Sequence, residues 1–107
     1  MDDDLVFKAL ADPARRGLLD SLHQRGGQSL GELAAGHSGM SRQAVTKHLD
    51  ILARANLVVV ERAGRVRLHH LNPVPIQEIA DRWIGKFQRA PLRALADLKQ
   101  TLEGKDP

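Results

Sequence analysis

The chain has 107 residues, of which 42% are hydrophobic and only 3% aromatic, so it suits one domain with a modest aliphatic core. It has no cysteine, which excludes disulfides, thiolate metal sites and thiol redox chemistry. The net charge is +3, no apolar run approaches the length of a membrane span, and the acidic residues 2–4 have the wrong sign for a secretory leader. We therefore expect a cytoplasmic protein.

Two helices are predicted at the start of the chain. Apolar residues recur at helical spacing at Leu5, Val6, Ala9 and Leu10, with Phe7 beside them. Asp12 followed by Pro13 is typical of a helix N-cap with proline at the first helical position. The helix that starts there ends near residues 26–27 and carries an apolar stripe of Leu18, Leu19 and Leu22.

A helix-turn-helix pattern is predicted over about residues 29–55. Ser29 and Glu32 match a capping box, in which the hydroxyl and the carboxylate each satisfy a free backbone N–H at the helix start. This third helix is short and stops around Gly36, residues 37–40 form a turn, and Ser41 is suited to cap the next helix. A helix, a short glycine-containing turn and an amphipathic helix follow each other in the order of that motif.

The helix predicted over residues 41–55 has two distinct sides. Its apolar side consists of Val45, Leu49 and Leu52. Its polar side consists of Gln43, Thr46, Lys47, Asp50 and Arg54. An amide, a hydroxyl, an ammonium and a guanidinium group can contact base edges and phosphates in the major groove of DNA. We therefore predict that the polar side of this helix faces DNA.

A β-hairpin is predicted over about residues 57–72. Residues 57–62 are rich in β-branched side chains, residues 63–64 supply a turn, and residues 66–71 alternate as a returning strand. In that alternation Val66 and Leu68 are expected to face the core, and Arg65 and Arg67 to face outward. Residues 41–72 hold six Lys and Arg against two acidic residues, a balance of +4 within a chain of net charge +3. A basic surface confined to one third of a chain is typical of nucleic-acid-binding proteins.

The C-terminal part, about residues 75–103, is predicted to form dimerisation helices. The stripe of a fifth helix consists of Ile76, Ile79, Ala80, Trp83 and Phe87. Pro91 either kinks that helix or opens a sixth, which carries Leu92, Leu95, Leu98 and Leu102. The first helix and these last ones have more apolar surface than a core of this size needs. We therefore expect them to bury each other across the two-fold axis of a homodimer.

Several short segments follow each other in the order and spacing of a known family. They are Ala11–Arg16, Glu32–Ala34, Ser41–Leu49, Leu52, Ala55–Val58, Gly64–Arg65 and Leu71. Together they resemble the ArsR-type (arsenical-resistance repressor) winged helix-turn-helix proteins, in the branch without the usual metal ligands. The chain has residues 90–91 where that branch commonly carries two aromatics, and His69 where the family usually has a wing tyrosine.

The resemblance implies a single domain, residues 1–107, that is mainly α with a small β-hairpin. Such a winged helix-turn-helix has five or six helices and a two-stranded wing, and it dimerises through its terminal helices. The resemblance also implies a bacterial transcriptional regulator, usually a repressor, that binds an inverted-repeat operator in double-stranded DNA as a homodimer.

The candidate DNA-binding residues lie on the second helix of the motif and on the wing. By position in the family they are Ser41, Arg42, Gln43, Thr46, Lys47 and His48 on the helix, and Arg62, Arg65 and Arg67 on the wing. The chemistry of the side chains suggests a role for each: Gln43 suits adenine, Arg42 suits guanine, and Thr46 suits a thymine methyl group or a phosphate. Lys47 and the wing arginines suit phosphates, which fix the register without reading the sequence.

A metal site is not expected. The arsenic and cadmium sensors of the family place Cys-x-Cys on the third helix, where this chain has residues 29–31 without cysteine. The zinc and nickel sensors use Asp-x-His with a downstream histidine pair, and residues 81–83 lack the histidine. His69 and His70 are adjacent on a strand, so they point to opposite faces and cannot bind one ion. We expect no cofactor and no catalytic residue either, because neither a cysteine nucleophile nor a phosphate-binding glycine loop is present.

Three questions stay open at this point. The alternative function is a winged-helix protein-interaction module with only non-specific affinity for nucleic acid. Trp83 and Phe87 either pack in the dimer core or line a pocket for an unknown small-molecule effector. Arg15 and Arg16 either touch the DNA backbone or form an intramolecular ion pair near the second helix.

Overall fold

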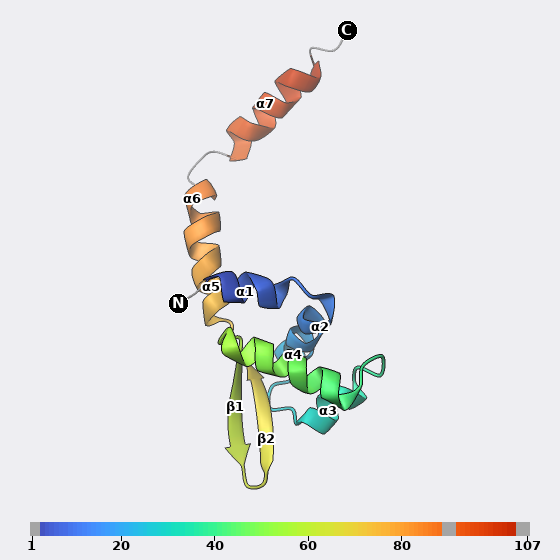
Figure 1. The fold of residues 1–107 in the computed structure, drawn as a ribbon. Helices are drawn as coiled ribbons and strands as arrows, with labels where there is room; N and C mark the ends of the chain where they lie inside the picture. Colours follow the sequence, from blue (N-terminus) through green and yellow to red (C-terminus); the bar gives the residue numbers. More distant parts are fainter. Residues whose placement is uncertain (1–2, 89–91, 105–107) are drawn as a thin grey trace. The chain divides into compact units, whose positions relative to one another are not determined.

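The computed structural model describes residues 3–88 and 92–104 (Figure 1). In chain order its elements are α1 (Asp3–Leu10), α2 (Pro13–Gln24), α3 (Leu30–Ala35), α4 (Arg42–Arg54), β1 (Val58–Ala63), β2 (Val66–Leu71), α5 (Val74–Ile79), the π-helical segment η1 (Ala80–Ile84), α6 (Gly85–Gln88) and α7 (Leu92–Gly104). The chain divides into two compact units, with the boundary after Ile76. None of the described helices is long and apolar enough to cross a membrane.

The helices of the first unit begin at the predicted capping residues. The Asp12 carboxylate accepts a 2.7 Å hydrogen bond from the Ala14 N–H at the start of α2. Ser29 and Glu32 form the capping box of α3, and both of its hydrogen bonds are 3.2 Å long. The Ser41 hydroxyl accepts from the Ala44 N–H at 3.1 Å and so starts α4. The predicted caps are confirmed.

The core lies among the four helices of the first unit and the start of β1. Its buried apolar side chains are Val6, Ala9, Leu18, Leu19, Leu22, Leu33, Val45, Leu49, Leu52, Ala55, Leu57 and Val58. This set contains the whole predicted apolar side of α4 and the whole stripe of α2. Since α4 buries one side against the other helices, its opposite side is presented to solvent.

The wing is a two-stranded antiparallel hairpin that extends from the helices (Figure 1). Val58 pairs with Leu71 at its base and Ala63 with Val66 at its tip. Gly64, in the turn, has a φ of +64°, a left-handed conformation that suits glycine. The predicted inward position of Val66 in β2 is wrong, because Val66 is 47% exposed, and the buried residue of the strand is His69 at 8% exposure. Leu68 is half-buried, and Arg65 and Arg67 are exposed.

The burial of His69 has a physical cause at the base of the wing. A short bridge joins His69 to Gln28 in the α2–α3 loop. The His69 N–H donates to the Gln28 carbonyl at 2.8 Å, and the Gly27 N–H donates to the His69 carbonyl at 2.9 Å. Gln28 is itself buried, and its side-chain amide donates to the Arg25 carbonyl at 2.7 Å. The side chain of His69 bonds to the same loop, since its Nδ1 atom lies 2.9 Å from the Gln28 carbonyl, and this contact holds the ring inward.

The second unit begins within the helical run that α5 opens. That run continues through η1 and α6 and covers the predicted fifth helix. In it the rings of Trp83 and Phe87 lie 6.4 Å apart between centroids, and the Lys86 ammonium lies 3.8 Å above the Trp83 ring centre. α7 is the separate sixth helix that the leucine pattern predicted, whereas Pro91 itself lies outside the described residues.

Candidate nucleic-acid interface

The polar side of α4 is exposed along its length. Arg42, Gln43, Thr46 and Lys47 are all exposed and together line one shallow recess. The Thr46 hydroxyl donates to the Arg42 carbonyl at 2.9 Å, which leaves the Thr46 methyl group and oxygen lone pairs for outside contacts. The structure thus brings four of the predicted residues together on one surface of one helix.

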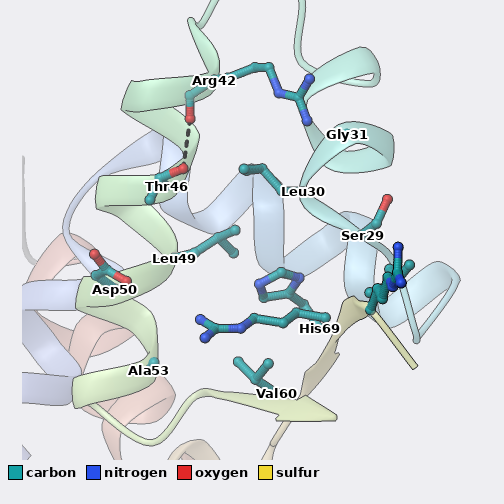
Figure 2. Close-up of a pocket in the computed structure, with 13 residues that line it drawn as sticks. Ser29, Leu30, Gly31, Arg42, Thr46, Leu49, Asp50, Ala53, Val60 and His69 are labelled. Atoms are coloured by element: carbon teal, nitrogen blue, oxygen red, sulfur yellow. Dashed lines mark hydrogen bonds between the residues drawn. The ribbon is translucent and has the colours of Figure 1, made fainter. Parts of the chain in front are cut away.

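Arg42 reaches from α4 toward the helix before it. Figure 2 shows its side chain extending over α3 near Gly31. A Cβ atom at Gly31 would lie 3.5 Å from the Arg42 Nη2 atom, which is an ordinary contact distance. The guanidinium of Arg42 therefore lies beside Gly31 of α3, at the edge of the exposed polar side of α4.

A hollow of about 430 Å³ lies between α3, α4 and the wing (Figure 2). Its charged lining residues are Arg42 and Asp50 from α4 and Arg65 and Arg67 from the wing. The rest of its lining consists of Ser29, Leu30, Gly31, Thr46, Leu49, Ala53, Val60, Val66 and His69. Three guanidinium groups against one carboxylate give the hollow a positive charge, which favours an anion.

The wing arginines are exposed and gather near the tip. Arg62 and Arg67 are direct partners across the hairpin, so their side chains leave the same face of the sheet. Arg65 lies in the turn beside Gly64 and is also exposed. Like charges directly opposite each other disfavour a hairpin, and a bound anion relieves that repulsion. The arrangement is therefore suited to contact phosphates.

His48 lies on the flank of α4 and is half-buried. Its Nδ1 atom is 3.3 Å from the Arg15 Nη1 atom. Arg15 also donates to two carbonyls of α1, those of Ala9 at 2.8 Å and Lys8 at 2.9 Å. The ring of His48 is thus engaged within the fold, and its contact with DNA stays a prediction.

The intramolecular interpretation of Arg15 is confirmed, because its Nη1 atom lies 3.5 Å from the Asp12 carboxylate. The Ala14 N–H and then the Arg15 guanidinium hold the pKa of Asp12 below its usual value. Arg16 donates to the Leu10 carbonyl at 2.7 Å. Both arginines therefore help to join α1 to α2.

The two wing histidines point to opposite faces, as predicted. The His69 Nδ1 atom is 2.9 Å from the Gln28 carbonyl, and the His70 Nε2 atom is 3.2 Å from the Glu61 carboxylate. Among the described residues, no three His, Asp or Glu side chains are grouped so that they could hold a metal ion.

Sequence reasoning did not include His69 in the site, although it lines the hollow between α4 and the wing. An alternating strand can present either face to the core. The signal that decides between them is the pairing with Gln28, which is 41 residues away in the chain.

Comparison with known proteins agrees with this geometry. Residues 10–61 match the model of a helix-turn-helix domain family, HTH_20. Over 86 residues the chain is 37% identical to YuzN of Bacillus subtilis (strain 168), an uncharacterized HTH-type transcriptional regulator, covering 76% of this chain and 94% of YuzN. It is 36% identical over 82 residues to the transcriptional repressor SdpR of the same organism, covering 77% of this chain and 88% of SdpR. An ArsR-like transcriptional regulator from Rhodococcus sp. RHA1 superposes with a TM-score of 0.72 at 32% identity, over 96% of this chain and 92% of that one.

Proposed function

Because the chain belongs to the ArsR-type family of winged helix-turn-helix transcriptional regulators, we propose that it is a repressor that binds an inverted-repeat operator as a homodimer. The observation that carries the proposal is the exposed polar side of α4, which lies next to a basic wing. Repression is supported by the relative SdpR, which is called a transcriptional repressor. We expect the protein to act in the cytoplasm on double-stranded DNA, with no need for a cofactor.

In this proposal α4 lies in the major groove and reads the bases. Gln43 forms a bidentate pair with adenine and Arg42 with guanine, and each pair contributes about 1–3 kcal/mol of discrimination. Thr46 presents its methyl group to a thymine, because its hydroxyl hydrogen is bonded to the Arg42 carbonyl. These assignments depend on the exposure of the three side chains on one side of α4.

The remaining predicted residues position the protein on the duplex. Lys47 on α4 and Arg62, Arg65 and Arg67 on the wing bind backbone phosphates. Ser41, as the N-cap, and His48, on the flank of α4, lie close to the same backbone. Phosphate contacts of this kind add affinity on any sequence, so specificity is left to the base contacts of α4.

The homodimer is supported by apolar side chains that remain exposed in the single chain. In α1, Leu5 is 43% and Phe7 is 46% exposed. In the second unit, Trp83 is 47%, Phe87 is 58% and Leu98 is 54% exposed. A second copy of the chain buries these groups, and its two-fold symmetry matches the symmetry of an inverted-repeat operator.

Competition binding on a recovered site tests this proposal. Fragments of the source genome that the protein retains are sequenced, and the shared site is measured against random duplex at moderate salt. A specific regulator holds its site roughly a thousand-fold more tightly than random DNA, with two chains per duplex. A ratio near one would instead support the alternative, a protein-interaction module with only non-specific nucleic-acid affinity.

A further inference from the structure

The two ring nitrogens of His69 have different surroundings. Nδ1 lies 2.9 Å from the Gln28 carbonyl, and since a carbonyl only accepts, Nδ1 carries the proton and donates it. In the described chain, no fully enclosed side-chain nitrogen or oxygen lacks a hydrogen bond. Among the described residues Nε2 has no hydrogen-bond partner, so it is not fully enclosed. We therefore take Nε2 as the ring nitrogen that is open to the hollow, which His69 lines. Figure 2 shows the ring near Leu30 of α3 and Leu49 of α4, among the residues that line the hollow.

The charged groups that line the hollow together with His69 favour an anion. α4 contributes Arg42 and Asp50, and the wing contributes Arg65 and Arg67. The α3 side and β1 contribute only uncharged residues to the lining. A second proton on His69 adds one more positive charge beside three guanidinium groups. Protonation therefore becomes more favourable once an anion occupies the hollow.

The position of the hollow indicates which anion it receives. The hollow lies between α4 and the wing. When a helix occupies the major groove and a wing contacts the adjacent minor groove, the ridge between them is the sugar–phosphate backbone. A phosphodiester of that ridge is therefore the group placed over the hollow.

We propose that His69 is a further DNA-contacting residue, whose Nε2 takes up a proton on binding and donates it in a hydrogen bond to a backbone phosphate in the hollow. This inference rests on the proposed function. The proton comes from solvent and stays on Nε2 while the duplex is bound. Since the complex holds one proton more than the free protein and DNA, affinity is greatest at low pH and falls as the pH rises.

The test is the pH dependence of operator affinity at constant ionic strength, between about pH 6 and pH 8, where histidine ordinarily titrates. If binding is coupled to the uptake of one proton, the affinity for the operator should fall by up to about tenfold for each unit by which the pH rises. His69→Asn is the informative variant, because its amide nitrogen takes the place of Nδ1 toward Gln28 and it has no counterpart of Nε2. We expect this variant to bind the operator with the pH dependence lost.

Two other histidines give matched controls. His23 is an exposed residue of α2, and His23→Asn should keep the full pH dependence. His48 is the rival source of a proton, since it lies on α4. His48→Asn should also keep the pH dependence of operator affinity. If the pH dependence were lost in His48→Asn and kept in His69→Asn, the assignment to His69 would be overturned.

Nuclear magnetic resonance of the wild-type protein gives an answer even if His69→Asn fails to fold. The His69 ring signal is followed against pH in the free protein and in the complex. The midpoint of its titration should move to higher pH in the complex, and an unmoved midpoint refutes the proposal. If specific binding persists without this proton uptake, only this inference fails, whereas absence of specific binding at every pH refutes the proposed function itself.

Discussion

α4 and the wing carry the two halves of the proposed interface, and they are held in different ways. α4 buries Val45, Leu49 and Leu52, so its polar side is fixed by the core of the first unit. In the wing, β1 buries only Val58 and β2 buries only His69. A base pair is read only when donors and acceptors meet within a fraction of an ångström, whereas a phosphate attracts a guanidinium over a wider range. The rigid element therefore suits reading, and the open hairpin suits positioning.

The wing is attached at its base rather than along its length. Backbone hydrogen bonds join this base to the α2–α3 loop, from the His69 N–H to the Gln28 carbonyl at 2.8 Å and from the Gly27 N–H to the His69 carbonyl at 2.9 Å. The Asn72 N–H donates to the Leu57 carbonyl at 2.8 Å and closes the hairpin. Beyond this base both strands are mainly exposed. A change at the tip should thus disturb the wing alone, while a change under α4 should disturb the whole first unit.

The largest expected effect comes from removing the support of α4. Leu52 is fully buried, and Leu52→Ala should lower the free energy of unfolding by about 2–5 kcal/mol through lost burial and a cavity. Ile51, its neighbour on the same helix, is 37% exposed, and Ile51→Ala should cost less than about 1 kcal/mol. Urea unfolding of the two variants checks this. Equal losses would mean that α4 is not held by its apolar side.

The next largest effect is expected on the recognition of bases by α4. Gln43→Ala should weaken binding to the operator by about 1–3 kcal/mol, roughly 5- to 150-fold, because one bidentate base contact is lost. Gln43 is exposed, so the free energy of unfolding should change little. Titration against the operator and a random duplex measures both affinities. If the affinity fell equally for the operator and for the random duplex, Gln43 would not contact a base.

The contrast between α4 and the wing also separates what sequence could predict from what it could not. The helical period of Val45, Leu49 and Leu52 and the cap at Ser41 are local signals, and both are confirmed. Which face of β2 turns inward depends on contacts with a loop that is far away in the chain. The alternation alone therefore predicted Val66 as a buried residue, whereas His69 is buried. The contacts of Arg15 with α1 are likewise set by packing between helices.

A smaller effect is expected at the tip of the wing. Gly64 has a φ of +64° and nothing within 4 Å of the position of a Cβ atom. Gly64→Ala should therefore lower the free energy of unfolding by about 1–2 kcal/mol through backbone strain alone. Gly39 also has open space around it but lacks a positive φ, which makes Gly39→Ala the matched control with little or no loss. Thermal unfolding of the two variants measures both losses of stability. If the losses were equal, the positive φ of Gly64 would not be the cause.

The smallest effect is expected from a single phosphate contact. Arg65→Ala should weaken binding to every duplex alike, roughly fivefold at 0.15 M salt, and lower the slope of log affinity against log salt by about 0.9. Gln43→Ala should leave that slope unchanged, because a base contact releases no counterion. Titrations at several salt concentrations measure the slope for both variants. If Arg65→Ala altered preference among sequences instead, the wing would read DNA as α4 does, and the division between a rigid reading helix and an open positioning hairpin would fail.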